Sequence, residues 1–110
     1  MKLSTSLIAL TLLGPSPAFA DNPALQLVQG DLFTDPVGSM LNVSVSNGMA
    51  KTLDFAAVKC SFTADGKPAG VAGTRIYNIL AGSTGESQVH LLGTKADAAT
   101  CEIVGSSPRT

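Results

Sequence analysis

Residues 39–47 read Ser-Met-Leu-Asn-Val-Ser-Val-Ser-Asn and carry the clearest structural signal in the chain. Leu41, Val43 and Val45 alternate with short polar side chains. Successive side chains of a β-strand point to opposite faces, so this pattern places all three apolar residues on one face. The dipeptide Asn47-Gly48 follows, and because both residue types tolerate positive φ it predicts a turn. Residues 39–47 are therefore predicted to form a half-buried strand.

Further strands are predicted on both sides of this one, separated by turn signals such as Asp35-Pro36-Val37-Gly38 and Asp65-Gly66. After the first twenty residues no segment shows a sustained period of 3.6, which a helix would require. Short strands with regular turns between them are typical of antiparallel sandwiches. We therefore expect an all-β, Ig-like antiparallel β-sandwich, whose other strands are residues 25–28, 52–63, 69–80, 87–92 and 100–104.

The segment 52–63 changes phase partway along. In its downstream half the apolar residues are at even-numbered positions, namely Val58, Cys60 and Phe62. In its upstream half they are at odd-numbered positions, namely Leu53, Phe55 and Ala57. An extra residue in one strand shifts the alternation by one position. We expect a bulge or bend near Ala56-Ala57 that lets both sets reach the core.

The segment 69–80 is uneven in composition. Gly70 and Gly73 lie in its first half, and glycine in a strand is typical of an edge or a sheet corner. The second half, residues 76–80, is apolar enough to predict a central position.

Residues 1–20 have the pattern of a secretory signal peptide. Lys2 precedes an apolar run over residues 7–13, and Ala18-Phe19-Ala20 supplies the small residues of a cleavage site. The run is far shorter than the roughly 20 residues of a membrane span, so no stable membrane insertion is expected after cleavage. We expect a helical leader (1–20), an N-terminal segment with the first strand (21–38), a sandwich core (39–104) and a polar tail (105–110). The product would be soluble, in the bacterial periplasm or secreted.

Cys60 and Cys101 are the two cysteines of the chain. In an exported protein an even number of cysteines favours a disulfide, and both residues fall on inward positions of predicted strands. A C-x-x-C motif, typical of redox chemistry, is absent. We predict a Cys60–Cys101 disulfide.

Composition excludes several classes of partner. The chain has 7 basic and 8 acidic residues, and removal of Lys2 with the leader leaves 6 against 8. Nucleic acids require a concentrated basic face, so no nucleic-acid partner is expected. With no Trp and one Tyr, the chain also offers little aromatic surface for stacking on sugars or bases.

No constellation of residues points to catalysis or to a cofactor. His90 is the single histidine and alternates with Val89 and Leu91, so it should point away from their face. No G-x-S-x-G nucleophile elbow occurs, so we expect no enzyme and no catalytic residue. Two sets of side chains contain possible metal ligands: the loop carboxylates Asp21, Asp31 and Asp35, and the soft ligands Met40 and Met49. Because neither a D-x-D-x-D-G nor a Met-x-Met motif is present, we expect turn formation and packing to be their roles, and no metal site.

Residues 42–86 resemble the FxLYD domains, small Ig-like sandwich modules of exported bacterial proteins. The likeness rests on Val43-Ser44-Val45-Ser46-Asn47, Val58-Lys59-Cys60-Ser61-Phe62, Asp65-Gly66-Lys67-Pro68 and Ile79-Leu80-Ala81-Gly82. The sequence departs from the pattern where Phe62-Thr63-Ala64-Asp65 lacks the tyrosine and where Ala81 replaces a proline. The resemblance implies a non-catalytic envelope module and transfers no active-site residue.

Two functions follow as expectations. The first is a protein-interaction or structural module of the cell envelope, whose partner is another envelope protein contacted through end loops or an exposed strand edge near 69–73. The alternative is a small periplasmic metal- or ligand-binding protein that uses His90, the methionines or the loop carboxylates. No cofactor is expected for the first.

Overall fold

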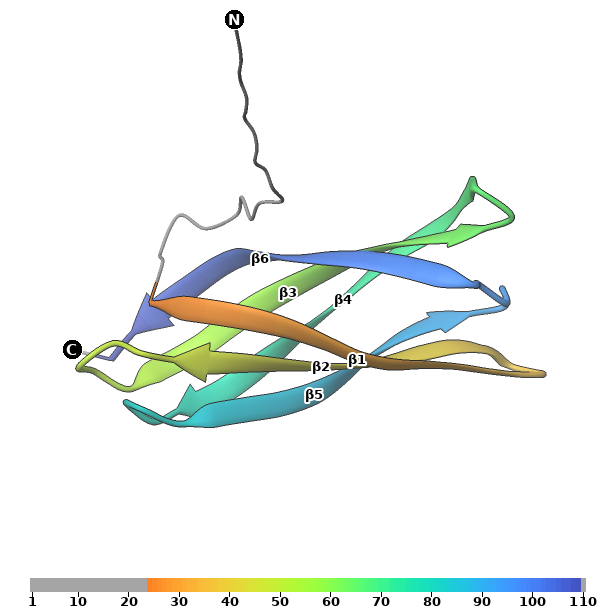
Figure 1. Cartoon of the computed structure of the whole chain (residues 1–110). Helices are drawn as coiled ribbons and strands as arrows, with labels where there is room; N and C mark the ends of the chain where they lie inside the picture. Colours follow the sequence, from red (N-terminus) through yellow and green to blue (C-terminus); the bar gives the residue numbers. More distant parts are fainter. Residues whose placement is uncertain (1–23, 110) are drawn as a thin grey trace, which may run out of the picture.

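The computed structural model describes residues 24–109 and folds them into six β-strands (Figure 1). The predicted leader, its cleavage site, Asp21 and Thr110 lie outside the described residues. In chain order the strands are β1 (Leu25–Asp35), β2 (Gly38–Asn47), β3 (Leu53–Ala64), β4 (Lys67–Ile79), β5 (Thr84–Leu92) and β6 (Ala98–Pro108).

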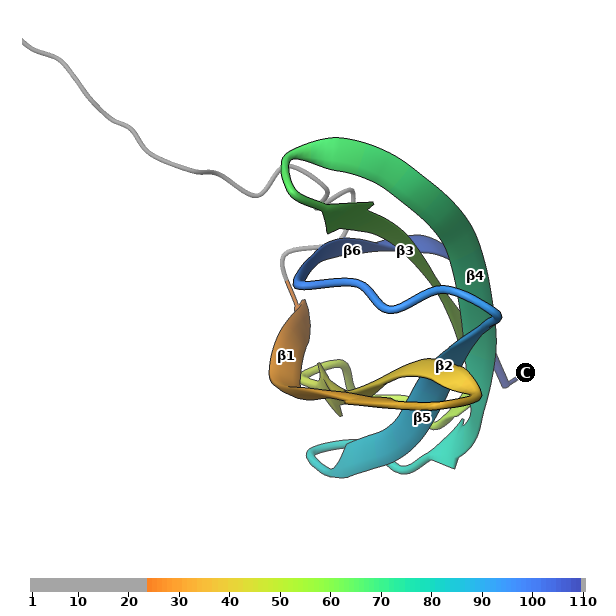
Figure 2. The ribbon, with the colours of Figure 1, turned by 90° about the vertical axis from the view of Figure 1, so that its right-hand side faces the viewer.

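The strands form two three-stranded antiparallel sheets, with the orders β1-β2-β5 and β4-β3-β6. Figure 2 shows the sheets as two layers, with β4 curving round one side of the molecule towards β5. The predicted all-β antiparallel sandwich is confirmed. β2 and β3 are the central strands, which explains why they are the most regularly apolar segments of the sequence.

The core lies between the sheets and is built from inward-facing side chains, which occupy alternate positions along the strands. Leu41, Val43 and Val45 of β2 are at most 2% exposed, as their alternation predicts. They lie in one buried cluster with Val58, Cys60 and Phe62 of β3, Ile76 and Ile79 of β4, and Val89 of β5.

The apolar alternation of β3 changes partway along the strand, as expected, but the upstream residues that are buried differ from those expected. Its pairing with β6 shifts between Leu53 and Phe55 and again between Ala57 and Val58. Leu53 and Ala56 are completely buried, whereas Phe55 is half-buried and stacks beneath the Arg75 guanidinium, 4.4 Å from the ring centroid. The expectation that Phe55 and Ala57 reach the core is therefore wrong, since neither belongs to the buried cluster. The register partner of Phe55 is the exposed Tyr77, so both rings lie on the outer face of the sheet.

β4 is an edge strand along its whole length, because β3 is its one sheet neighbour. The edge position expected from Gly70 and Gly73 is confirmed. The central position expected for residues 76–80 is wrong: Ile76 and Ile79 are buried, but Tyr77 and Leu80 are each more than half exposed.

The turns at 35–38 and 65–66 are confirmed. Asp35 Oδ1 accepts hydrogen bonds from the amides of Val37 (2.8 Å) and Gly38 (3.1 Å). Asp65 and Gly66 both have positive φ, as a tight hairpin turn demands. β2 also ends at Asn47 as predicted, although neither Asn47 nor Gly48 has positive φ.

The first and last strands are longer than the sequence suggested. β1 continues through Gly30-Asp31 with a register irregularity between Gln29 and Leu32. β6 continues past Val104, because its backbone pairs with β3 as far as the Leu53↔Pro108 position.

Candidate interaction surface

The two sides of the sandwich, where the edges of the two sheets face each other, differ in how closely the sheets approach. On one side β4 and β5 come close and link the sheets. Thr74 Oγ1 and Ser87 Oγ are 3.0 Å apart, and a Cβ built on Gly85 would lie 2.6 Å from Ile76 Cγ2. This side is therefore closed by packing between β4 and β5.

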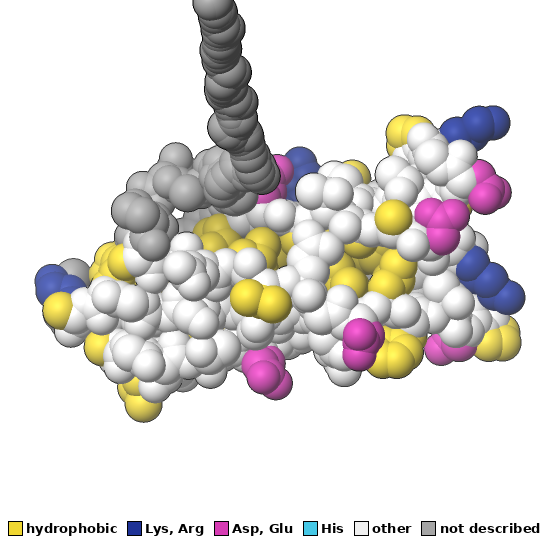
Figure 3. Space-filling model, viewed as in Figure 1, with side chains coloured by type: hydrophobic (Ala, Val, Ile, Leu, Met, Phe, Trp, Pro, Cys, Tyr) yellow, Lys and Arg dark blue, Asp and Glu magenta, His cyan; other side chains and the backbone are white. Residues whose placement is uncertain are grey.

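On the other side the edge strands are β1 and β6, which share no ladder pairing. Five hydrophobic residues there pack against the core but remain partly exposed, and we call them the apolar strip: Leu27 and Leu32 of β1, and Ala99, Cys101 and Ile103 of β6. Figure 3 shows hydrophobic side chains gathered in the region that lies between β6 and β1 in Figure 1. Among residues 24–109 the sandwich is thus open along this side, and the edges of β1 and β6 that flank the strip have no strand partner there.

Gln29 is the polar link across this opening. It shares the inward alternation of Leu25 and Leu27, and its side-chain amide reaches the backbone of β6. Its Nε2 donates to the Ala99 carbonyl at 2.9 Å, and its Oε1 accepts from the Cys101 amide at 2.7 Å. The side chain of one residue thereby forms the two hydrogen bonds that a neighbouring strand would form at this point.

The Cys60–Cys101 disulfide joins the apolar strip to the central strand β3. The two residues are register partners on adjacent strands of one sheet, with Cα atoms 4.0 Å apart, and the predicted pairing is confirmed. Cys60 is completely buried, while Cys101 is partly exposed. A disulfide in a β domain is consistent with an oxidising compartment outside the cytoplasm.

A second surface feature is a polar hollow of about 680 Å³ on the outer face of the β1-β2-β5 sheet. His90 is exposed there and points away from the buried Val89, as its alternation predicts. Met40 is its cross-strand register partner. The hollow is lined by Val28, Gly30, Asn42, Val43, Ser44, Glu86, Ser87, Gln88 and His90.

The candidate metal ligands are not brought together. Met49 packs against the core beyond the end of β2, apart from the hollow. Asp35 caps its own turn, and Asp31 is exposed in β1. Within residues 24–109 no three side chains of the His, Cys, Asp and Glu types are grouped so that they could hold a metal ion.

Sequence reasoning missed the strip and Gln29. Leu27 and Leu32 are five positions apart, and it is the irregularity after Gln29 that aligns them on one face. The Gln29 contacts join residues 70 and 72 positions apart, so no local pattern could reveal them. Residues 24–109 also contain no helix that is long and apolar enough to cross a bilayer.

Comparison of the chain with protein-family models, with curated protein sequences and with solved structures found no match.

Proposed function

We propose that this chain is a non-catalytic β-sandwich module, exported to the bacterial periplasm or secreted, that acts by contacting another envelope protein. The observation that carries the proposal is the open side of the sandwich, where β1 and β6 flank the apolar strip. An unpaired edge exposes a row of backbone donors and acceptors, and natural proteins usually cover or charge such edges. An edge left open beside an apolar strip suits a contact surface.

Three further features support an envelope location and a binding role. Residues 1–20 have the composition of a leader, and the Cys60–Cys101 disulfide suits an oxidising compartment. The resemblance of residues 42–86 to FxLYD domains, which are non-catalytic modules, points the same way.

The contact surface we propose differs from the edge that the sequence suggested. The glycine-rich part of β4 does lie at a sheet edge, but β5 runs beside it. A Cβ built on Gly70 would lie 2.8 Å from Leu91 Cδ1, which places a β5 side chain against this edge. β6 is the opposite edge strand of the same sheet, and no strand within residues 24–109 pairs with its free side.

In-cell photo-crosslinking tests the proposal. A benzophenone amino acid replaces Glu102 on β6, Gln88 in the polar hollow or Lys67 at the far β3–β4 turn, all of which are exposed. After irradiation of producing cells, we expect adducts with another exported protein from position 102 and none from position 67. Correctly exported protein that forms no adduct from any position would contradict an interaction module.

The polar hollow supports a second candidate function, the binding of a small polar ligand or metal ion. Its volume lies in the range of small-molecule sites, and it presents amide, hydroxyl, carboxylate and imidazole groups. Native mass spectrometry of protein from cells grown with copper, zinc and calcium tests it. A bound mass that is lost in His90→Ala would support this candidate, whereas apo protein alone would reject it.

A further inference from the structure

We infer that the free edge of β6 accepts one extended segment of another exported protein as an added strand, with alternate aliphatic side chains of that segment packed on the apolar strip. The inference rests on the proposed function and specifies the mode of contact and the chemistry of the partner.

The backbone of β6 has groups directed away from β3. Ala99 and Cys101 bond to Gln29 through a carbonyl and an amide, so these groups face the free edge. In a strand the amide and carbonyl of one residue point to the same side, and the direction alternates with a period of two. Ile103 is in register with Val58, two positions along from the Cys60↔Cys101 pair, so its amide also faces the free edge.

Gln29 occupies part of this edge. A primary amide presents one donor and one acceptor, the same pair that a peptide group of a neighbouring strand would supply. An added strand would displace the Gln29 side chain from Ala99 and Cys101 and continue along Ile103. The side chain therefore shields the edge while the partner is absent.

The side chains of the strip define the segment that fits. Leu27, Leu32, Ala99, Cys101 and Ile103 carry no charge, so inward positions of the segment must be aliphatic. Residues of an added strand opposite Cys101 and Ile103 would point inward and would also direct their amides at β6. On the outer face Glu102 is the single charged residue of β6, which favours a lysine or a polar residue beside it.

We assign the segment to another exported protein, in keeping with the proposed function. A second copy is disfavoured because its β6 carries its own Gln29 across the same groups, and both side chains would have to be displaced.

Hydrogen exchange with a defined peptide tests the inference. The probe is an end-capped peptide of alternating threonine and valine with a lysine at each end, added to the mature oxidised protein. We expect the Ile103 amide to exchange at least about ten-fold more slowly with millimolar peptide, because it gains a hydrogen bond. The control peptide carries N-methyl groups on its valines, which removes the donors that face β6, and it should give no protection.

Matched variants locate the bound strand. Leu27→Lys places a charge in the strip and should abolish the protection. Val28→Lys adds the same charge on the opposite face of β1, where the side chain is 56% exposed, and should leave the protection intact. Gln29→Ala removes the shield and should lower the peptide concentration needed for half-maximal protection.

Three results of the exchange experiment would overturn the inference. One is unchanged Ile103 exchange in wild-type protein at every peptide concentration. Another is equal protection by the N-methylated peptide. The third is protection that rises with protein concentration alone, together with a sedimenting dimer, which would make a second copy the occupant. Crosslinks from position 88 with none from position 102 would reject the added strand and still support an interaction module, whereas no crosslinks at all would reject both.

Discussion

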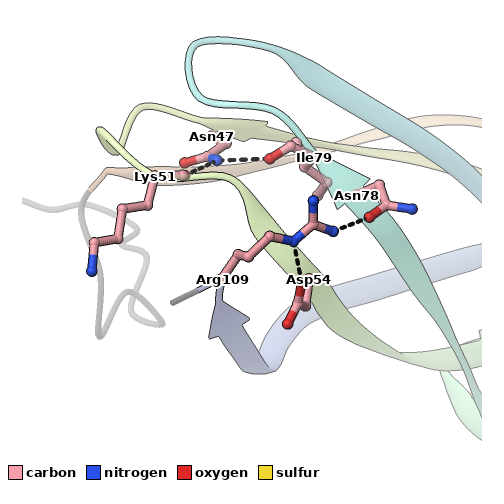
Figure 4. Close-up of polar contacts among 6 residues, drawn as sticks. All are labelled: Asn47, Lys51, Asp54, Asn78, Ile79 and Arg109. Atoms are coloured by element: carbon pink, nitrogen blue, oxygen red, sulfur yellow. Dashed lines mark hydrogen bonds and ion pairs between the residues drawn. The ribbon is translucent and has the colours of Figure 1, made fainter.

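Asn47 is a buried polar residue that ties the end of β2 to two other segments. Its side chain is 1% exposed and donates to the carbonyls of Lys51 (2.8 Å) and Ile79 (2.9 Å), as Figure 4 shows. Its Oδ1 also accepts from the amide of Met49 at 2.9 Å. The sequence marked Asn47 as a turn residue, but its contribution comes from these hydrogen bonds and not from positive φ.

We predict that Asn47→Ala lowers the free energy of unfolding by about 2–3 kcal/mol, because the substitution leaves buried backbone groups without partners. Urea denaturation of the oxidised protein measures the change. Ser46→Ala is the matched control: Ser46 shares one exposed hydrogen bond with Thr84, so its loss should cost less than about 0.5 kcal/mol. Equal effects of the two substitutions would show that the Asn47 contacts do not stabilise the fold.

In contrast to the buried hydrogen bonds of Asn47, the contacts of Arg109 lie at the surface. Its Nε donates to Asp54 Oδ1 at 2.7 Å, its guanidinium also bonds Asn78 Oδ1, and the paired side chains are about half exposed (Figure 4). Asp54 lies where the β3–β6 pairing shifts between Leu53 and Phe55, and Asn78 of β4 has positive φ. The contact therefore covers an irregular point of the sheet.

Because exposed ion pairs contribute little, Arg109→Ala should lower the free energy of unfolding by less than about 1 kcal/mol. The difference from wild type should shrink further in 1 M NaCl, where the charges are screened. Urea titrations at low and high salt measure both values. A loss of several kcal/mol that is insensitive to salt would contradict a surface role.

The sequence predicts best the strands that have one apolar face towards the core and one polar face towards the outside. β2 alternates without interruption, and its predicted bounds differ from the observed ones by one residue. The sequence predicts β6 only over residues 100–104, because Gly105-Ser106-Ser107 show no alternation of apolar and polar side chains. Their strand conformation comes from backbone pairing with β3, a tertiary contact that no local pattern encodes.

Gly85 of β5 lies where the closed side of the sandwich is tightest. A Cβ at this position would lie 2.6 Å from Ile76 Cγ2 and 3.0 Å from Ile79 Cγ1, and both isoleucines are buried. We predict that Gly85→Ala overpacks this side and lowers the free energy of unfolding by about 1–3 kcal/mol. Gly105→Ala in β6 is the matched control, because its Cβ would meet nothing closer than Ala57 Cβ at 4.0 Å. Thermal unfolding of both variants tests this, and an unchanged midpoint for Gly85→Ala would show that β5 can move away from β4.

For the molecule as a whole, the asymmetry between the closed β4–β5 side and the open β1–β6 side was beyond sequence reasoning. Each residue of the apolar strip reads locally as an ordinary inward position. Leu27 and Ile103 form a surface because no strand of the described part of the chain lies between β1 and β6, and this depends on how distant segments pair. The disulfide was predictable because it needed only the export signal and two cysteines on inward positions.

The disulfide also links the stability of the whole domain to its open side. Cys60 and Cys101 are 41 residues apart, and closing a loop of that length restricts the unfolded chain enough to stabilise the fold by about 4 kcal/mol.

Since Cys101 belongs to the partly exposed strip, a small phosphine should reach the bond in the folded protein. We predict that reduction by the phosphine adds two hydrogen atoms to the mass of the protein and lowers the free energy of unfolding in urea by up to this amount. The double variant Cys60→Ala/Cys101→Ala should be about as unstable as the reduced protein. If the reduced and oxidised forms unfold at the same urea concentration, the bond does not stabilise the sandwich. β6 would then be held by its pairing with β3 alone.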